Sequence, residues 1–142
     1  EALAQADVDG DYSRPEVRAA TAEYYRRHVS KVPEDERPAN LHSPEPDPVG
    51  DECYHFMQGM SEFVVTGALS HWSVVGQLPT IDVPTLVTSG AADECTPLVA
   101  KQVADGIPGA RWELFPDGTH WVHGEQPERY NAVVERFLEE HE

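Results

Sequence analysis

The feature of this sequence that most constrains its fold is the order of apolar and amphipathic segments between residues 84 and 138. Residues 84–89 (PTLVTS) and 111–115 (RWELF) are short, rich in β-branched and aromatic side chains, and followed by glycine or proline, as β-strands are. Residues 97–106 and 127–138 each begin with proline, which is favoured in the first turn of a helix. The order strand, helix, strand, helix predicts an α/β fold with parallel strands.

The last of these segments has the clearest periodicity. Its apolar side chains recur with the spacing i, i+3, i+4, i+7 and i+8, at Tyr130, Val133, Val134, Phe137 and Leu138. This spacing places them on one face of a helix. We therefore expect that face to pack against the predicted strands.

The first half of the chain is less regular. Ser13 followed by Glu16 has the spacing of a capping box and predicts a helix that runs to His28. Residues 32–50 hold five of the twelve prolines among acidic side chains, which predicts an extended connector. One or two helical turns are expected at residues 53–59, and the stretch that follows to residue 80 has no clean period.

The charge of the chain excludes several classes of function. With 26 Asp and Glu residues against 10 Lys and Arg residues, the formal net charge is −16 at pH 7. Such a chain repels phosphate groups, so we expect it to bind neither nucleic acid nor an anionic membrane surface. No apolar run approaches the roughly 18 residues of a membrane-spanning helix.

The two cysteines, Cys53 and Cys95, are far apart in the sequence and form no C-x-x-C pair. Their spacing matches neither a zinc site nor the disulfide framework of a small secreted domain. We therefore expect the protein to be cytoplasmic.

Polar side chains follow both predicted strands, in the loops at residues 90–97 and 117–123. Asp93 lies in the first loop and His120 in the second. Because loops at the carboxyl ends of parallel strands meet at one edge of a sheet, we expect these side chains to face each other. A carboxylate that accepts a hydrogen bond from the Nδ1–H of an imidazole leaves Nε2 able to take a proton from a nucleophile. The pair therefore predicts two of the three residues of a catalytic triad.

The third residue of such a triad is a nucleophile. Aspartate followed by histidine, both late in the chain, is the order of α/β hydrolases, in which an earlier serine lies on a G-x-S-x-G turn. The nearest string in this chain, residues 59–63 (GMSEF), lacks the second glycine and follows no predicted strand. Ser61 is therefore a poor candidate, and we expect the nucleophile to lie outside these residues.

Other interpretations of the two loops stay open at this point. Taken singly, Asp93 is also typical of a capping aspartate and His120 of an ordinary loop histidine. His120 and His123, with Glu125 and Asp93 nearby, also have side chains suited to zinc or manganese, although the pair lacks the H-E-x-x-H helix of metalloproteases. We favour the acid and base of a triad, with no metal, because the two residues follow consecutive strands.

Several strings between residues 52 and 142 occur together in one known family. The narrowest of them is GMSEFVVTG at residues 59–67. The others are Trp72 and residues 83–87 (VPTLV), 90–97 (GAADECTP), 118–120 (GTH) and 125–131 (EQPERYN). On these strings, residues 52–142 resemble the C-terminal part of the proline iminopeptidases, or prolyl aminopeptidases, which are α/β-hydrolase serine peptidases that remove an N-terminal residue, typically proline. The earlier residues 24–29 (YYRRHV) resemble the helical cap of this family.

The resemblance implies a domain organisation. Residues 1–66 correspond to part of a helical cap, with the proline-rich connector at residues 32–50. Residues 67–142 correspond to the C-terminal segment of an α/β-hydrolase core, a parallel sheet edge with flanking helices.

The resemblance also implies the roles of three residues. Asp93 and His120 are the acid and base of the triad, and Glu62 is a cap carboxylate that pairs with the free amino terminus of the substrate. A carboxylate opposite an α-ammonium makes a charge-assisted contact that requires a free amine. No cofactor is implied, because a serine triad needs none.

We therefore expect a C-terminal fragment of a serine aminopeptidase that acts on a small peptide or on an amino-acid amide or ester. Without the nucleophile, the chain alone is expected to be inactive and to require a complementing upstream segment. Two alternatives remain. One is a related α/β hydrolase, such as an esterase or amino-acid amidase, and the other is a non-catalytic module that binds a partner or forms a homo-oligomer through its sheet edge.

Overall fold

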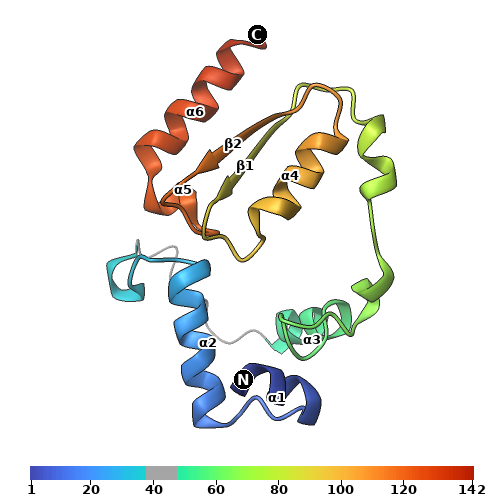
Figure 1. Ribbon diagram of the computed structural model, residues 1–142, viewed down its shortest axis with the longest axis vertical. Helices are drawn as coiled ribbons and strands as arrows, with labels where there is room; N and C mark the ends of the chain where they lie inside the picture. The colour runs from blue at the N-terminus through green and yellow to red at the C-terminus, as the bar shows by residue number, and fades with distance from the viewer. Residues whose placement is uncertain (38–47) are drawn as a thin grey trace. The chain divides into compact units, whose positions relative to one another are not determined.

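The computed structural model of the chain describes residues 1–37 and 48–142. They divide into two compact units, which Figure 1 shows in sequence colours. The first unit is made of Glu1–Glu23 and Glu34–Ser73, and the second of Tyr24–Pro33 and Val74–Glu142. The last part of α2 thus belongs with the C-terminal half of the chain, whereas the predicted domain boundary after residue 66 stays a prediction.

The first unit is helical in its described part. It contains α1 (Ala2–Asp9), the beginning of α2 (Pro15–His28), η1 (Glu34–Glu36), α3 (Pro48–Met57) and η3 (Ala68–His71). The helix predicted to end at His28 is confirmed. α1 ends at Gly10, whose φ of 73° is the left-handed conformation that commonly terminates a helix.

Two features of this unit differ from expectation. The sequence pattern does not predict α1, because its small apolar side chains form no sustained stripe. α3 begins at Pro48, inside the segment expected to be extended, because proline is tolerated in the first turn of a helix, where its missing N–H is not needed. Residues 38–47 of the predicted connector lie outside the described residues.

The second unit contains the predicted alternation of strands and helices. Its elements are η4 (Val75–Thr80), β1 (Leu86–Gly90), α4 (Pro97–Gly106), β2 (Arg111–Phe115), α5 (Val122–Glu125) and α6 (Pro127–Glu139). The predictions for residues 97–106, 111–115 and 127–138 are confirmed, the last with one further residue. The first strand runs from Leu86 to Gly90 instead of from 84 to 89, and the loop after β2 holds the short helix α5, which the sequence does not predict.

The two strands form a parallel pair with Leu86 opposite Arg111 and Gly90 opposite Phe115. Successive side chains of a strand point to opposite faces, so alternate residues of β2 share a face. On one face, Arg111 pairs with Glu140, Glu113 pairs with Arg129, and Phe115 stacks on Tyr130. These contacts place α6 on that face, and Figure 1 shows α4 on the other side of the strands.

Phe115 is the centre of the small core under α6. Its side chain is fully buried and clusters with Val122 and Val133, against which Leu86 and Tyr130 also pack. The ring stacks on Tyr130 with a centroid distance of 5.9 Å. Phe115 is also the last residue of β2, so this core anchors the point at which the second loop begins.

Candidate active site

Asp93 and His120 lie in contact in the second unit. The Asp93 Oδ1 and His120 Nδ1 atoms are 2.9 Å apart. An ionised carboxylate can only accept a hydrogen bond, so Nδ1–H donates and Nε2 of the neutral ring carries a lone pair. The Asp93 side chain is 7 % exposed and that of His120 is 53 % exposed. A buried acceptor thus orients an imidazole whose other nitrogen faces outward, an arrangement suited to a general base.

Backbone contacts between the two loops produce this geometry. The N–H of Ala91 donates to the carbonyl of Phe115 at 2.9 Å, and the N–H of Ala92 donates to the carbonyl of Gly118 at 3.0 Å. The first contact comes directly after the last pair of the two strands, Gly90 and Phe115, and the second lies between the two loops. The loops are therefore held together directly before Asp93 and His120.

The Asp93 carboxylate is oriented from its own loop. Its Oδ1 atom also accepts the backbone N–H of Cys95 at 2.8 Å, the local turn that aspartate side chains commonly form. Glu94, the next residue, places Oε1 4.0 Å from His120 Nε2, on the reactive side of the ring. Two carboxylates therefore flank the imidazole, one at each nitrogen.

The same surroundings change the pKa of the Cys95 thiol. Desolvation, followed by the carboxylates of Asp93 and Glu94, raises the pKa of Cys95. A raised pKa keeps the thiol neutral near pH 7 and so makes it a weak nucleophile. This disfavours Cys95 as the nucleophile of the candidate site.

The end of α2 contributes contacts to the site that the sequence does not predict. The carbonyl of His28 accepts the N–H of His120 at 2.9 Å and the N–H of Glu94 at 3.3 Å. The His28 ring donates from Nδ1 to the carbonyl of Ala92 at 2.8 Å. His28 therefore contacts both loops of the candidate site, although even Ala92 in the nearer loop is 64 positions away in sequence. No local pattern around residue 28 indicates such pairing.

Glu125 also makes contacts beside the candidate site that the sequence does not predict. Its two carboxylate oxygens accept hydrogen bonds from the backbone N–H and side-chain hydroxyl of Thr119 and from the backbone N–H of Lys31. Thr119 is fully buried and adjoins His120. The carboxylate of Glu125 is thus committed to backbone and hydroxyl donors.

The metal interpretation of this region has no support in the structure. Among residues 1–37 and 48–142, no three side chains of His, Cys, Asp or Glu come together as a group able to hold a metal ion. The His123 ring instead contacts the rings of Trp121 and Tyr130, at centroid distances of 5.7 and 5.9 Å.

The remaining predicted residues lie in the first unit. Glu62 is exposed and follows Ser61, whose buried hydroxyl accepts the backbone N–H of Phe63 at 3.1 Å. The Ser61 hydroxyl is thus used in a local turn. The role of Glu62 stays a prediction.

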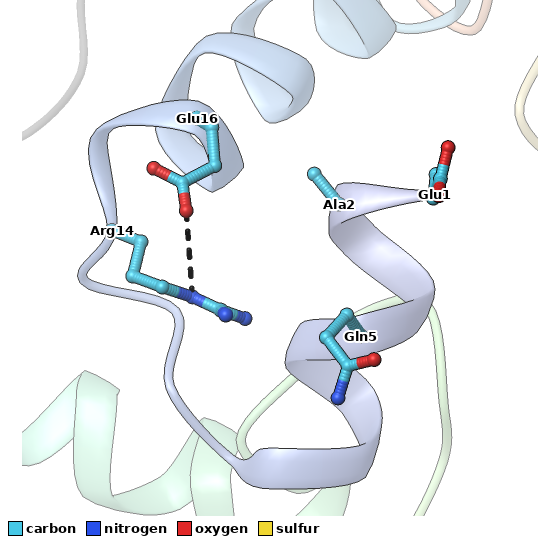
Figure 2. Close-up of a pocket in the computed structure, with 5 residues that line it drawn as sticks. All are labelled: Glu1, Ala2, Gln5, Arg14 and Glu16. Atoms are coloured by element: carbon cyan, nitrogen blue, oxygen red, sulfur yellow. Dashed lines mark ion pairs between the residues drawn. The ribbon is translucent and has the colours of Figure 1, made fainter.

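A pocket between α1 and the start of α2, also in the first unit, is lined by Glu1, Ala2, Gln5, Arg14 and Glu16 (Figure 2). The Arg14 guanidinium lies 3.1 Å from Asp9, 3.8 Å from Asp11 and 3.9 Å from Glu16. Its charge is already balanced by carboxylates, and none of the predicted site residues lines this pocket.

Within the described ranges, no helix is both long and apolar enough to cross a bilayer.

Comparison with known proteins relates the chain to one family of enzymes. No family model matches. The proline iminopeptidase of Lacticaseibacillus rhamnosus is 36 % identical over 137 residues, and that of Clostridium botulinum is 36 % identical over 138 residues. These alignments cover 96 % and 97 % of this chain. In both cases the chain spans 46 % of the length of the relative.

Comparison with solved structures also relates the chain to a proline iminopeptidase. The crystal structure of proline iminopeptidase from Mycobacterium smegmatis matches with a TM-score of 0.76 at 37 % identity, over 99 % of this chain and 46 % of that one. The structure of VinJ matches with a TM-score of 0.76 at 31 % identity, over 98 % of this chain and 47 % of that one. Over almost its whole length, the chain is therefore homologous to the C-terminal part of the proline iminopeptidases and shares their α/β-hydrolase fold.

Proposed function

We propose that this chain carries the acid and the base of a serine-type hydrolase that releases an N-terminal residue, typically proline, from small peptides or amino-acid amides and esters. The observation that carries the proposal is the 2.9 Å contact between Asp93 Oδ1 and His120 Nδ1. The names of the relatives support the choice of reaction. Since the chain spans about half the length of these relatives, the activity is assigned to the complete polypeptide.

In the proposed reaction, His120 Nε2 takes the proton of a serine hydroxyl as that oxygen attacks the substrate carbonyl. The resulting imidazolium then protonates the leaving amine, and the cycle repeats with water to release the acyl group. Asp93 holds the ring in the required tautomer and stabilises its positive charge. The serine belongs to a part of the protein outside these residues, so the chain alone is expected to be inactive.

Glu62 is proposed to bind the α-ammonium of the substrate. Glu62 is exposed, and an ammonium paired with a fixed carboxylate selects chain ends over internal peptide bonds. The two exposed, unpaired cysteines suit a reducing compartment, so we also propose a cytoplasmic location.

The catalytic part of the proposal is tested with His120→Ala in the complete polypeptide, using a prolyl amide as substrate. We expect kcat to fall by roughly 10³- to 10⁶-fold, because the serine loses its base. His123→Ala is the matched control, since this exposed histidine of the same loop does not contact Asp93. Equal activity of His120→Ala and the unmodified enzyme would exclude His120 as the base.

The substrate part is tested separately with Glu62→Gln. Cleavage of substrates with a free amino terminus is expected to fall by at least about tenfold, the value of one lost charge-assisted contact, whereas a neutral ester is hydrolysed as before. Equal losses on both substrates would reject Glu62 as the ammonium-binding residue and favour an esterase or amidase.

A further inference from the structure

The segment His28–Lys31, which begins at the last residue of α2, is hydrogen-bonded to the loop that carries His120 at both of its ends. The carbonyl of His28 accepts the N–H of His120, and the carbonyl of Val29 accepts the N–H of Trp121, both at 2.9 Å. The Lys31 ammonium donates to the carbonyl of Asp117 at 2.8 Å. These contacts join two segments about 90 positions apart in the chain.

The carboxylate of Glu125 lies at the end of this paired segment and binds both of its sides. Oε1 accepts the backbone N–H of Lys31 and the hydroxyl of Thr119, both at 2.6 Å, and Oε2 accepts the backbone N–H of Thr119 at 2.9 Å. Every donor in this cluster comes from the segment before His120 or from the segment that pairs with it. Glu125 therefore ties the two segments together with one side chain.

Proton counting shows why a carboxylate suits this position. The Thr119 hydroxyl has one proton but two acceptors within reach, the carbonyl of Val29 at 2.8 Å and Glu125 Oε1 at 2.6 Å. The backbone N–H of Lys31 points to Oε1 of Glu125 and that of Thr119 to Oε2, so both oxygens of the Glu125 side chain must be acceptors. A glutamine side chain offers one carbonyl oxygen and one NH₂ group, so in either orientation one backbone N–H would face another donor.

We propose that Glu125 is a positioning residue for His120, acting through Thr119 and the His28–Lys31 segment. This inference rests on the proposed function, in which His120 is the general base. His120 is half exposed, so contacts of its backbone and Asp93 determine where Nε2 lies. Loss of the Glu125 contacts would free the backbone directly before His120, and displacements of about 1 Å in such a group cost on the order of 10²-fold in rate.

The direct test is amide hydrogen exchange by NMR on the 142-residue chain with Glu125→Gln. The exchange rates at Lys31, Thr119 and His120 are expected to rise by at least about tenfold, because a charge-assisted hydrogen bond is lost and a donor is left unpaired. Glu135→Gln is the matched control: this exposed glutamate of α6 undergoes the same chemical change and should leave all three rates within about twofold.

The downfield resonance of the His120 Nδ1 proton gives a second reading in the folded protein. In Glu125→Gln it should broaden or disappear through faster exchange with water, whereas Glu135→Gln should retain it. A role in stability alone would leave this signal intact in the molecules that stay folded. Protected amides in α4 report whether the variant is folded.

If Glu125→Gln does not fold, Thr119→Val is tested in its place, because valine has nearly the volume of threonine and carries a methyl group where threonine has its hydroxyl. We expect faster exchange at His120 in this variant as well. In the complete polypeptide, either variant should lower kcat by about tenfold or more with KM within about twofold, since the base is misplaced but the substrate contacts are intact.

Unchanged exchange at His120 in a folded Glu125→Gln or Thr119→Val protein would overturn the positioning role, as would an unchanged kcat. Failure of the proposed function is distinguishable from this result. If the unmodified complete polypeptide does not hydrolyse prolyl substrates, the aminopeptidase proposal fails, whereas the exchange rates and the His120 proton still decide whether Glu125 holds this loop.

Discussion

Gly90 lies against the backbone of Gly118 so closely that a Cβ atom on Gly90 would overlap the carbonyl group of Gly118 and the carbonyl oxygen of Thr119. Gly90 is the last residue of β1, and Gly118 follows the turn after β2. The two loops of the candidate site thus approach each other at a point where only glycine fits. This contact lies between the strands and the Asp93–His120 pair.

The first prediction concerns this contact. Gly90→Ala is expected to lower the free energy of unfolding by roughly 1–3 kcal/mol, because the backbone of the second loop cannot shift as a flexible side chain would. Urea denaturation followed by circular dichroism measures this. Gly76→Ala is the control, since a Cβ there meets nothing within 4 Å and the change should be small. Equal midpoints for the two variants would contradict the close-approach argument.

The second prediction concerns the role of Asp93 in orienting the His120 ring. Asp93→Asn in the complete polypeptide should lower kcat by about 10⁴-fold, because an amide that donates to Nδ1 stabilises the wrong tautomer of His120. The ¹⁵N chemical shifts of the imidazole report the tautomer directly. A variant that keeps Nδ1 protonated and retains full activity would show that Asp93 does not orient the ring.

The third prediction follows from the raised pKa of Cys95, which desolvation and the carboxylates of Asp93 and Glu94 cause. Because the pKa is raised, the thiolate fraction near neutral pH is smaller than in a free thiol. The rate of alkylation, which depends on the thiolate, therefore rises only as the pH increases. In a Cys53→Ser background, iodoacetamide should therefore modify Cys95 more slowly than it modifies an N-acetylcysteine amide. Asp93→Asn should accelerate the reaction, since one carboxylate is removed. A rate equal to that of the free thiol would contradict the assigned environment.

The fourth prediction concerns the core that supports the second loop. Phe115→Ala should cost about 3–5 kcal/mol of stability, because it leaves a cavity beside Val122 and Val133 and removes the stacking on Tyr130. Thermal unfolding monitored by circular dichroism tests this. Leu98→Ala on α4 is the control, because this leucine is 81 % exposed and its truncation should change stability by less than about 0.5 kcal/mol.

Much of the second unit could be predicted from local pattern. The apolar stripe of α6 and the proline at its start both describe properties of neighbouring residues, and the helix forms where they indicate. The strand at residues 111–115 is confirmed for the same reason. By contrast, α1 and the start of α3 depend on weak apolar spacing, so the pattern neither predicts α1 nor places the beginning of α3 correctly.

The sequence by itself determined the order β1, α4, β2 and α6 and the two loops that carry Asp93 and His120, because strand and helix periodicity and the rule for parallel strands are local or topological. Only the tertiary structure decided that Asp93 contacts Nδ1 of His120, that His28 binds both loops, and that Glu125 joins Thr119 to Lys31. These contacts connect residues up to 94 positions apart. Their geometry depends on how whole segments pack, and no spacing within one segment encodes it.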